Sequence, residues 1–384
     1  MTMKVKNLIT FSILLFLLMS CRNQSVNNED NSTNWSIFRG NPALTGHTNV
    51  SLPNNPVLLW TFQSGSNTRS SPVVYNQVAY WSDRRGRIFG VDINGEQVFD
   101  FNMNTAVDAI PMVHNNVLYI GRIDGFLYAI CLEKQVVLWT FEAQGQIGAS
   151  PNRMIFDGKD AIIVGCFDSY LYVLNSKTGE EIARFESGDR INGAVAQNNN
   201  ILVYGGCDGW IRVIDASSGR QTDSLHVGMY IPGSPAMIGN FVYIADHDGN
   251  VFELRLNRGQ IASHRKIFEP RDDNRRHTSV PAVTDNILYI LSDDRHVYAI
   301  NRSDGSIVWS YLLRGDTSES SPVVANDRLL VYTRNGIVTI LDAQTGRLVW
   351  DYDIGEQIFA SPAVINGHFY VLTSRGNLFA FGNR

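Results

Sequence analysis

The sequence predicts an all-β fold, an eight-bladed β-propeller made of four-stranded antiparallel blades and closed by an N-terminal strand. Three observations predict it. A unit of about 41 residues recurs eight times, each unit contains four short strand patterns separated by turn residues, and the last unit lacks a fourth strand, which stands instead ahead of the first unit. The composition agrees, because 32 glycines, 11 % aromatic residues and only 18 % charged residues are typical of short strands joined by tight turns.

Residues 1–20 are predicted to be a lipoprotein signal peptide and no part of the fold. Lys4 and Lys6 precede the apolar run LITFSILLFLLMS, which is too short and badly flanked for a stable membrane span. The ending, Leu-Met-Ser-Cys at residues 18–21, resembles the lipobox of bacterial lipoproteins. This resemblance implies that the signal is cut before Cys21 and that diacylglycerol on Cys21 anchors the mature protein. The alternative is an ordinary signal peptide followed by a chance cysteine.

Residues 21–34 are predicted to be the lipidated cysteine and a flexible tether. The segment RNQSVNNEDNSTN has no large apolar side chain, so it cannot support a core. Arg22, and not an aspartate, follows Cys21. By similarity to the sorting rules of proteobacteria, this favours the outer membrane, and we expect the protein to face the periplasm. An outward orientation stays open.

Residues 35–384 are predicted to form the propeller. Each unit opens with Ser-Pro or its equivalent, at intervals of 39 to 46 residues, and Ala194 takes this place in the unit without proline. Equal spacing of this kind indicates a radial or solenoidal array and not several domains. The opening positions are Pro72, Pro111, Pro151, Ala194, Pro235, Pro281, Pro322 and Pro362.

The four strands of a unit follow in a constant order. A short apolar run such as SPVV comes first, and an alternating strand such as VLYIG comes second. An Asx-Gly turn then follows in several units, where we expect positive φ at both turn residues. The third strand resembles FLYAI, and the fourth carries an aromatic residue, as in VLWTF. The residues expected to have structural roles are Gly125, Gly209, Gly249 and Gly336 in the turns and Trp60, Trp139, Trp309 and Trp350 in the fourth strands.

The two ends of the chain indicate that the array closes into a ring. The last unit stops at LFAFGNR without a fourth strand, while the strand LLWTF at residues 58–62 precedes the first unit. Pairing these segments would remove the exposed sheet edges that invite aggregation. An open solenoid would need polar caps, and none is visible in the sequence.

The repeat resembles the quinoprotein-like (PQQ-type) propeller repeat, whose pattern is Ala-x-Asp-x-x-x-Gly-x-x-x-Trp. The pattern occurs as Ala299-Asn301-Gly305-Trp309 and Asp342-Gly346-Trp350, and in worn form between Ala129 and Trp139. The resemblance covers residues 35–384, and Trp35 with FRGNPALTG looks like the N-terminal segment common in these propellers. It implies that the tryptophan packs between blades and that Asx and glycine form the preceding turn. It implies the fold and leaves the activity open.

Within this family, the resemblance implies two contrasting functions. Quinoprotein dehydrogenases bind pyrroloquinoline quinone and Ca²⁺, often carry a disulfide between adjacent cysteines, and build their site from inserts. This chain has no adjacent cysteines and little room for inserts, so we expect no enzyme activity and no cofactor. It looks more like the compact lipoproteins of the BamB type, which act as non-catalytic scaffolds in outer-membrane β-barrel assembly. A PQQ-dependent oxidoreductase and a propeller that binds an unassigned ligand remain alternatives.

The expected partner is therefore a protein, with the β-barrel assembly machinery as the candidate, and membrane contact is expected through the lipid anchor. The net charge is −5 and no basic stripe appears, so nucleic acid is not expected as a partner. HExxH and CxxC are absent, so no metal site is predicted. We expect a monomer.

Candidate partner-binding residues lie in the loops that lead from the fourth strand of one unit to the first strand of the next. These loops gather at one end of the channel, and the positions three residues before the unit openings face the axis; Ile191 is expected there in the fourth unit. For the charged members the alternative is a solvated rim of mutual ion pairs, and for the apolar pair it is packing against a neighbouring blade. The long charged loop after residue 268 is either a recognition loop or a tolerated insertion. The candidates are Arg69, Asp108, Asp189, Arg190, Met229, Tyr230, Arg271, Arg275, Arg276 and Glu319.

Three cysteines lie inside the predicted propeller. Cys166 and Cys207 occupy nearly equivalent turns of consecutive units but differ by one residue in register, which disfavours a bridge between them. We therefore expect Cys131, Cys166 and Cys207 to be thiols.

Overall fold

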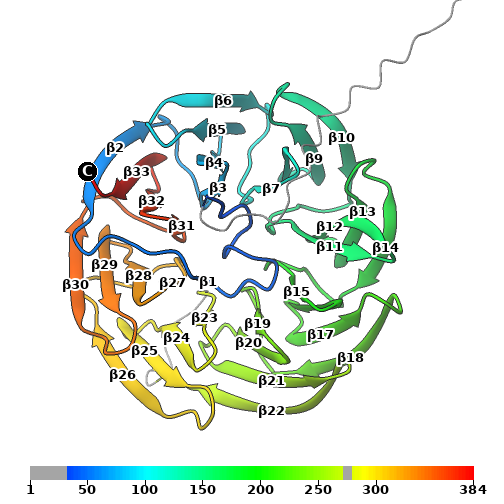
Figure 1. The fold of residues 1–384 in the computed structure, drawn as a ribbon. Coiled ribbons are helices and arrows are strands. Elements are labelled where there is room, and N and C mark those ends of the chain that lie inside the picture. The colour runs from blue at the N-terminus through cyan, green and yellow to red at the C-terminus, as the bar shows by residue number, and fades with distance from the viewer. Residues whose placement is uncertain (1–32, 271–278) are drawn as a thin grey trace, which may run out of the picture.

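A computed structural model describes residues 33–270 and 279–384 and has eight sheets arranged in a ring (Figure 1). The strands of each blade pair antiparallel, in sequence order in all but the last blade, and the first of the four strands lies nearest the axis. The predicted all-β, eight-bladed propeller is confirmed. Within the described residues, no helix is long and apolar enough to cross a membrane.

The first four blades contain the strands that follow. Blade 1 has β3 (Val73–Tyr75), β4 (Val78–Ser82), β5 (Arg87–Val91) and β6 (Gln97–Asn102). Blade 2 has β7 (Met112–His114), β8 (Val117–Gly121), β9 (Phe126–Cys131) and β10 (Val136–Glu142). Blade 3 has β11 (Asn152–Phe156), β12 (Lys159–Gly165), β13 (Tyr170–Asn175) and β14 (Glu181–Glu186). Blade 4 has β15 (Ala196–Asn198), β16 (Ile201–Gly205), β17 (Trp210–Asp215) and β18 (Arg220–His226).

The last four blades complete the ring. Blade 5 has β19 (Ala236–Ile238), β20 (Phe241–Ala245), β21 (Val251–Asn257) and β22 (Gln260–Phe268). Blade 6 has β23 (Ala282–Val283), β24 (Ile287–Leu291), β25 (His296–Asn301) and β26 (Ile307–Leu312). Blade 7 has β27 (Val323–Ala325), β28 (Arg328–Tyr332), β29 (Ile337–Asp342) and β30 (Leu348–Asp353). Blade 8 has β31 (Ala363–Ile365), β32 (His368–Leu372), β33 (Asn377–Gly382) and β2 (Val57–Gln63).

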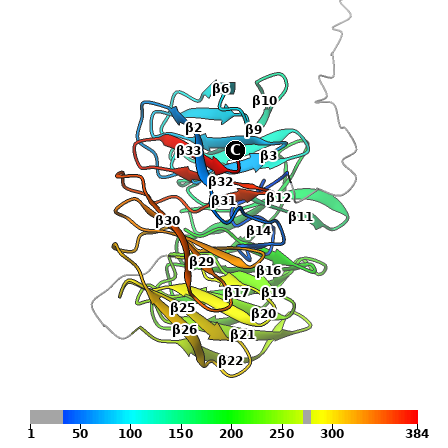
Figure 2. The same ribbon diagram turned by 60° about the vertical axis from the view of Figure 1, so that its left-hand side comes forward.

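The ring is closed by β2, as the ends of the sequence predict. β2 pairs antiparallel with β33, from Val57 opposite Gly382 to Gln63 opposite Asn377, and forms the outer strand of blade 8. Figure 2 shows β2 beside β33 in a second view. The C-terminal strand therefore has hydrogen-bonded neighbours on both sides.

A feature that the sequence did not predict is an inner belt, residues 35–51, which crosses the middle of the ring (Figure 1). Its carbonyl groups accept hydrogen bonds from the inner strands of blades 1 to 7 and from the inner turn of blade 8. It also contributes β1 (His47–Thr48), which pairs parallel with β27. The donors around the ring are the backbone N–H groups of Val74, Val113, Gln197, Met237, Val283, Val324 and Gly367 and the side-chain amide of Asn152.

Arg39, a residue of the inner belt, connects the belt to blades 6 and 7. Its guanidinium donates to the carbonyl oxygens of Pro322 at 2.6 Å and Pro281 at 3.1 Å, which belong to the openings of two neighbouring blades. Burial lowers the pKa of Arg39 to about 9, so the group remains charged at neutral pH. A side chain at Gly46 would collide with this guanidinium, and Gly46 has a positive φ of 61°, so glycine is required there.

The core lies between the faces of neighbouring blades. Ile88 and Phe99 of blade 1 pack in one buried cluster with Leu118 and Ile130 of blade 2. Similar clusters join blade 3 to blade 4, blade 5 to blade 6 and blade 6 to blade 7. Because each blade of the closed ring has a neighbour on both faces, its second and third strands are apolar along nearly their whole length.

Two details of the sequence prediction were wrong. In blade 4 the opening position is Val195 and not Ala194. Ala196 pairs with Val203 in blade 4, and in blade 1 the residue directly after the opening proline, Val73, pairs with Tyr80 in the same way. The proline that would have set the register is missing there. In the Asx-Gly turns only the glycine has positive φ, 94° at Gly125 for example, because these hairpin loops are longer than two residues.

Two positive φ angles in succession occur instead in the two-residue turns between the first and second strands. Asn115 and Asn116 have φ of 51° and 61°, and Asn199 and Asn200 have 47° and 65°. Asparagine tolerates this conformation because its short polar side chain can hydrogen-bond locally.

The cysteine prediction is confirmed for Cys166 and Cys207, which are both free. Cys131 ends β9 and is buried.

Candidate functional site

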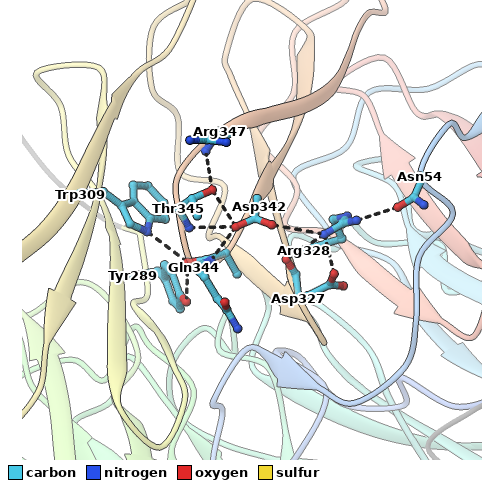
Figure 3. Close-up of polar contacts among 10 residues, drawn as sticks. Asn54, Tyr289, Trp309, Asp327, Arg328, Asp342, Gln344, Thr345 and Arg347 are labelled. Atoms are coloured by element: carbon cyan, nitrogen blue, oxygen red, sulfur yellow. Dashed lines mark hydrogen bonds and ion pairs between the residues drawn. The ribbon is translucent and has the colours of Figure 1, made fainter.

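The tryptophans of the repeat lie at the joints between blades. The indole N–H groups of Trp60, Trp139 and Trp309 donate to carbonyl oxygens in the next blade at 2.8, 2.9 and 3.1 Å. In Figure 3, Trp309 and Tyr289 both point at the same turn of blade 7, where they bond the carbonyl of Ala343. Trp350 instead packs edge-on against Phe369 and Phe381.

The glycine of the repeat is needed because the indole ring lies against it. A Cβ atom at Gly346 would lie 2.5 Å from the ring of Trp309, and one at Gly179 would lie 2.5 Å from Trp139. Both glycines also have positive φ. The turn glycines Gly125, Gly209, Gly249 and Gly336 have positive φ at the opposite end of the blades. These residues build the ring and offer no reactive group.

Blade 5 replaces the tryptophan by an arginine, a substitution that sequence reasoning missed. Arg265 lies opposite Glu253, in the register where Trp309 lies opposite Ala299. Its guanidinium bonds Glu253 at 2.7 Å and the carbonyl of Arg302 in blade 6 at 2.6 Å. The same joint is therefore made by a hydrogen bond from a guanidinium, which an ion pair inside blade 5 holds in place, and the small residue opposite tryptophan becomes glutamate.

The segment between the inner belt and β2 is tied to blade 7 by Arg328. This guanidinium bonds the side-chain oxygen of Asn54 and the carboxylate of Asp327, each at 2.6 Å, and lies 3.7 Å from Asp342 (Figure 3). Asp342 in turn accepts the backbone N–H groups of Gln344 and Thr345. The cluster connects the segment before β2 to blade 7.

Three of the predicted partner-binding residues meet at one end of the channel. Arg69, Asp108 and Glu319 line an axial cup with a volume of about 380 Å³. Because the opening of blade 4 is Val195, Asn192 takes the place expected for Ile191, and Ile191 is buried. The remaining residues of the lining that matter below are Phe38, Gln146, Ser150, Phe167, Ser234 and Ser321.

The charged groups around the cup are paired with one another. Arg69 lies 4.0 Å from Glu319, and both side chains are about half exposed, at 56 and 47 %. Asp108 accepts from Arg84 at 3.0 Å. Asp189 and Arg190, which are not in the lining, lie 3.9 Å apart. This is the arrangement of a solvated rim, and such exposed pairs contribute about 0–1 kcal/mol each.

A second feature of the same end is an exposed aromatic surface at the junction of blades 4 and 5, here called the blade 4–5 patch. Trp210, Met229 and Tyr230 are 38, 39 and 36 % exposed. Tyr230 stacks on His247 with ring centroids 4.1 Å apart, and Trp210 contacts His226 at 5.1 Å. Trp210 was not predicted as a candidate; its place directly after the Asp208-Gly209 turn was the available signal. Arg271, Arg275 and Arg276 lie outside the described residues.

The described residues of the cup do not fit pyrroloquinoline quinone with Ca²⁺. That anionic cofactor needs free cations, but Arg69, the cup's cation within the described residues, is paired with Glu319. Nor does the described part of the chain hold three His, Cys, Asp or Glu side chains placed for a metal ion.

Asp160, His114 and Ser176 lie together on blades 2 and 3, but their order does not suit nucleophilic catalysis. The carboxylate of Asp160 contacts both His114, at 3.3 Å, and the hydroxyl of Ser176, at 2.9 Å. A nucleophilic triad needs the histidine between the serine and the carboxylate, so that the imidazole removes the hydroxyl proton. Here the carboxylate stands in the middle.

Comparison with known sequences identifies the family. The profile of the family described as outer membrane protein assembly factor BamB matches residues 48–265 and 257–382. The chain belongs to the BamB family. The predicted resemblance to this family is therefore confirmed.

The individual relatives are distant. The BamB of Moranella endobia is 25 % identical over 158 residues, and this alignment spans 37 % of the chain and 39 % of the relative. The BamB of Shewanella oneidensis is 23 % identical over 419 residues, spanning 97 % of both proteins.

Solved structures show the same architecture. BamB from Moraxella catarrhalis superposes with a TM-score of 0.68 at 19 % identity, covering 86 % of this chain and 98 % of the other. The quinohemoprotein alcohol dehydrogenase of Comamonas testosteroni superposes with a TM-score of 0.75 at 13 % identity, covering 92 % of this chain and 81 % of the other. At such identities, the likeness establishes the fold, which BamB proteins share with enzymes.

Proposed function

We propose that this protein is a non-catalytic, lipid-anchored scaffold that binds a protein partner in the assembly of outer-membrane β-barrel proteins. The observation that carries the proposal is membership of the BamB family over nearly the whole propeller. The paired charges of the axial cup, which do not fit a quinone cofactor, support a binding role over an oxidoreductase.

The blade 4–5 patch is the surface proposed to contact the partner. Exposed tryptophan, tyrosine and methionine side chains are enriched where protein interfaces concentrate their binding energy. Trp210 begins β17, and Met229 and Tyr230 lie in the loop after β18, so all three are positioned by the sheets and little ordering entropy would be lost on binding. Asp189 and Arg190 lie in the preceding loop of the same face and would form its polar rim.

Site-specific photo-cross-linking in cells tests this surface. A photoreactive amino acid at Tyr230 is expected to capture a component of the β-barrel assembly machinery, identified by mass spectrometry. Tyr352, 38 % exposed on the outer strand of blade 7, is the matched control and is expected to capture none. Equal capture from both positions, or capture of no assembly component, would contradict the proposal.

The alternative oxidoreductase is tested on the purified protein. Under the scaffold proposal, pyrroloquinoline quinone and Ca²⁺ together produce neither a bound-cofactor spectrum nor reduction of a dye with alcohol substrates. Turnover with any of them would favour the enzyme.

The anchor is part of the same proposal: residues 1–20 as signal peptide, Cys21 as the lipidated residue and residues 21–34 as tether. The described chain begins beside the turn after β3, where the backbone N–H of Gln77 donates to Thr33. In an antiparallel blade this turn and the loops of the axial cup lie at opposite ends. The tether therefore joins the ring at the end opposite to the blade 4–5 patch and leaves this patch free for a periplasmic partner.

Metabolic labelling with a palmitate analogue tests the anchor. The wild-type protein is expected to be labelled and to fractionate with the outer membrane, whereas Cys21→Ser is expected to lose both properties. Cys207→Ser is the control and should keep the label, since Cys207 is a free thiol of the propeller. Label retained in Cys21→Ser would reject lipidation at this residue.

A further inference from the structure

The axial cup has binding capacity that the proposed scaffold role does not use. Phe38 of the inner belt contributes to its lining, so the belt lies behind the cup and a ligand enters from one end of the channel. Its volume of about 380 Å³ lies at the small end of the range for ligand pockets.

Buried hydroxyl groups supply hydrogen-bond donors to this cup. Ser234 and Ser321 are only 4 and 2 % exposed, and their oxygens accept the backbone N–H groups of Ala194 at 2.8 Å and Val280 at 2.9 Å. Among the described residues, neither hydroxyl proton has an acceptor. Ser150, 5 % exposed, makes only a long 3.4 Å contact to the carbonyl of Pro151. Buried polar groups normally have partners, so these three donors indicate a polar occupant.

Two side-chain amides add donors and acceptors. Gln146 lines the cup, and its amide makes no hydrogen bond to any residue in the described ranges. Asn192 donates to the carbonyl of Pro232 at 2.8 Å, which leaves its amide oxygen as an acceptor. The carboxylates of Asp108 and Glu319 keep acceptor capacity beyond their arginine partners, because each has about four acceptor sites.

The remaining described side chains of the cup are apolar, and its charged side chains are paired with groups of opposite charge. Phe38, Ile110 and Phe167 offer apolar surface beside the amides, and Gly148 keeps the space between Gln146 and Phe167 open. The negative charges of Asp108 and Glu319 are matched by Arg84 and Arg69. Among the described residues of the cup, no charged side chain is left without an ion pair to bind an anionic or cationic ligand.

From these groups we infer that the axial cup binds a neutral, polyhydroxylated ligand with one or two rings, a mono- or disaccharide. Each sugar hydroxyl both donates and accepts, which matches hydroxyl, amide and carboxylate groups placed side by side. The C–H faces of a sugar ring pack on aromatic side chains such as Phe167. A peptide fits less well, because an extended peptide is bound through a free strand edge and the inner strands are already bonded to the belt.

Calorimetric titration of the purified protein tests this inference. Maltose, cellobiose, trehalose and N,N′-diacetylchitobiose are the test ligands, and a tetrapeptide mixture is the competing class. We expect at least one disaccharide to bind. Gln146→Ala is expected to weaken this binding about tenfold, equivalent to about 1.4 kcal/mol. Gly148→Leu, which fills the cup, is expected to abolish it.

The matched control is Gln144→Ala. Gln144 belongs to the same loop, two residues from Gln146, but does not line the cup, so its removal should leave the affinity unchanged. Failure of every disaccharide to bind at millimolar concentration overturns the inference. So does binding that is equal in the wild type and Gly148→Leu, or binding of the peptides alone. None of these outcomes bears on capture by the blade 4–5 patch, so the two proposals fail separately.

Discussion

Arg39 is a fully buried cation whose stabilising contacts within the described residues are carbonyl groups and no carboxylate. Removing a charge from water is costly, so such a residue persists only where its hydrogen bonds are needed. Here the guanidinium occupies the acceptors of Pro281 and Pro322, which no other donor in the described structure reaches.

Arg39→Met is therefore expected to lower the free energy of unfolding by about 2–4 kcal/mol, because two buried carbonyl groups lose their partner. Chemical denaturation with an unchanged slope measures the loss. Arg87→Met, which removes an exposed ion pair with Asp100, is the control and should cost less than about 1 kcal/mol. A neutral effect of Arg39→Met would show that the belt does not depend on this residue.

Asp160 gives a pH-dependent prediction. Burial by itself raises its pKa, but the hydrogen bonds from His114 and Ser176 and the charge of Arg153 outweigh burial, so the pKa of the folded carboxyl is lowered. A depressed folded pKa contributes stability above the unfolded value, and this contribution is lost as pH falls through the folded value.

Asp160→Asn is expected to destabilise the protein at pH 7 by about 1 kcal/mol. The difference from wild type should narrow as the pH falls below about 4. Urea denaturation at a series of pH values measures it. Asp157→Asn, an exposed change in the same hairpin, should give no pH-dependent difference. A stability difference that widens as the pH falls would contradict a lowered pKa of Asp160.

At the scale of elements, the joints between blades repeat one arrangement with different chemistry. An aromatic or cationic side chain of the outer strand crosses to a carbonyl in the next blade, as Trp309 does to Ala343 and Arg265 does to Arg302. The repeat pattern in the sequence predicted the tryptophan joints. It missed the arginine joint, because Arg265 and Glu253 become partners only once β22 pairs with β21.

Trp309→Ala is expected to lose about 2–3 kcal/mol of stability, since a large, partly buried ring leaves the joint. Trp309→Phe keeps a ring against Gly346 but loses the indole hydrogen bond, so we expect a loss of about 1 kcal/mol. Denaturation midpoints measure both. Trp210→Ala, in the exposed patch, should leave the midpoint nearly unchanged, and an equal loss in all three variants would contradict this division of roles.

At the scale of the whole molecule, the N-terminal part of the chain closes the ring twice. The inner belt bonds every blade near the axis, and β2 completes blade 8 at the outside. An open ring would expose the edge of β33, a template for pairing with other chains.

Deletion of residues 57–63 is therefore expected to produce aggregates, measured by light scattering after size exclusion, whereas the full-length protein is expected to be a monomer. Deletion of residues 22–32 in the tether is the control and should leave a monomer. A monomeric protein without β2 would show that the belt alone keeps the ring closed.

The candidate site shows where prediction from the sequence ended. Arg69, Asp108 and Glu319 were placed correctly at the channel end because their distance from a proline landmark is constant. Asn192 was missed because blade 4 lacks that proline, and an error of one residue exchanges a buried position for an exposed one. Trp210 was missed because its exposure depends on how two neighbouring blades meet.

The sequence by itself determined the number of blades, their strand order and the closure by the first full strand. These properties follow from local turn chemistry and hydrophobic period repeated along the chain, which need no knowledge of distant contacts. Only the tertiary structure decided the course of the inner belt, the burial of Arg39 and the pairing of charges around the axial cup. Those features join residues from separate blades, and their chemistry depends on which groups the closed ring brings within hydrogen-bond distance.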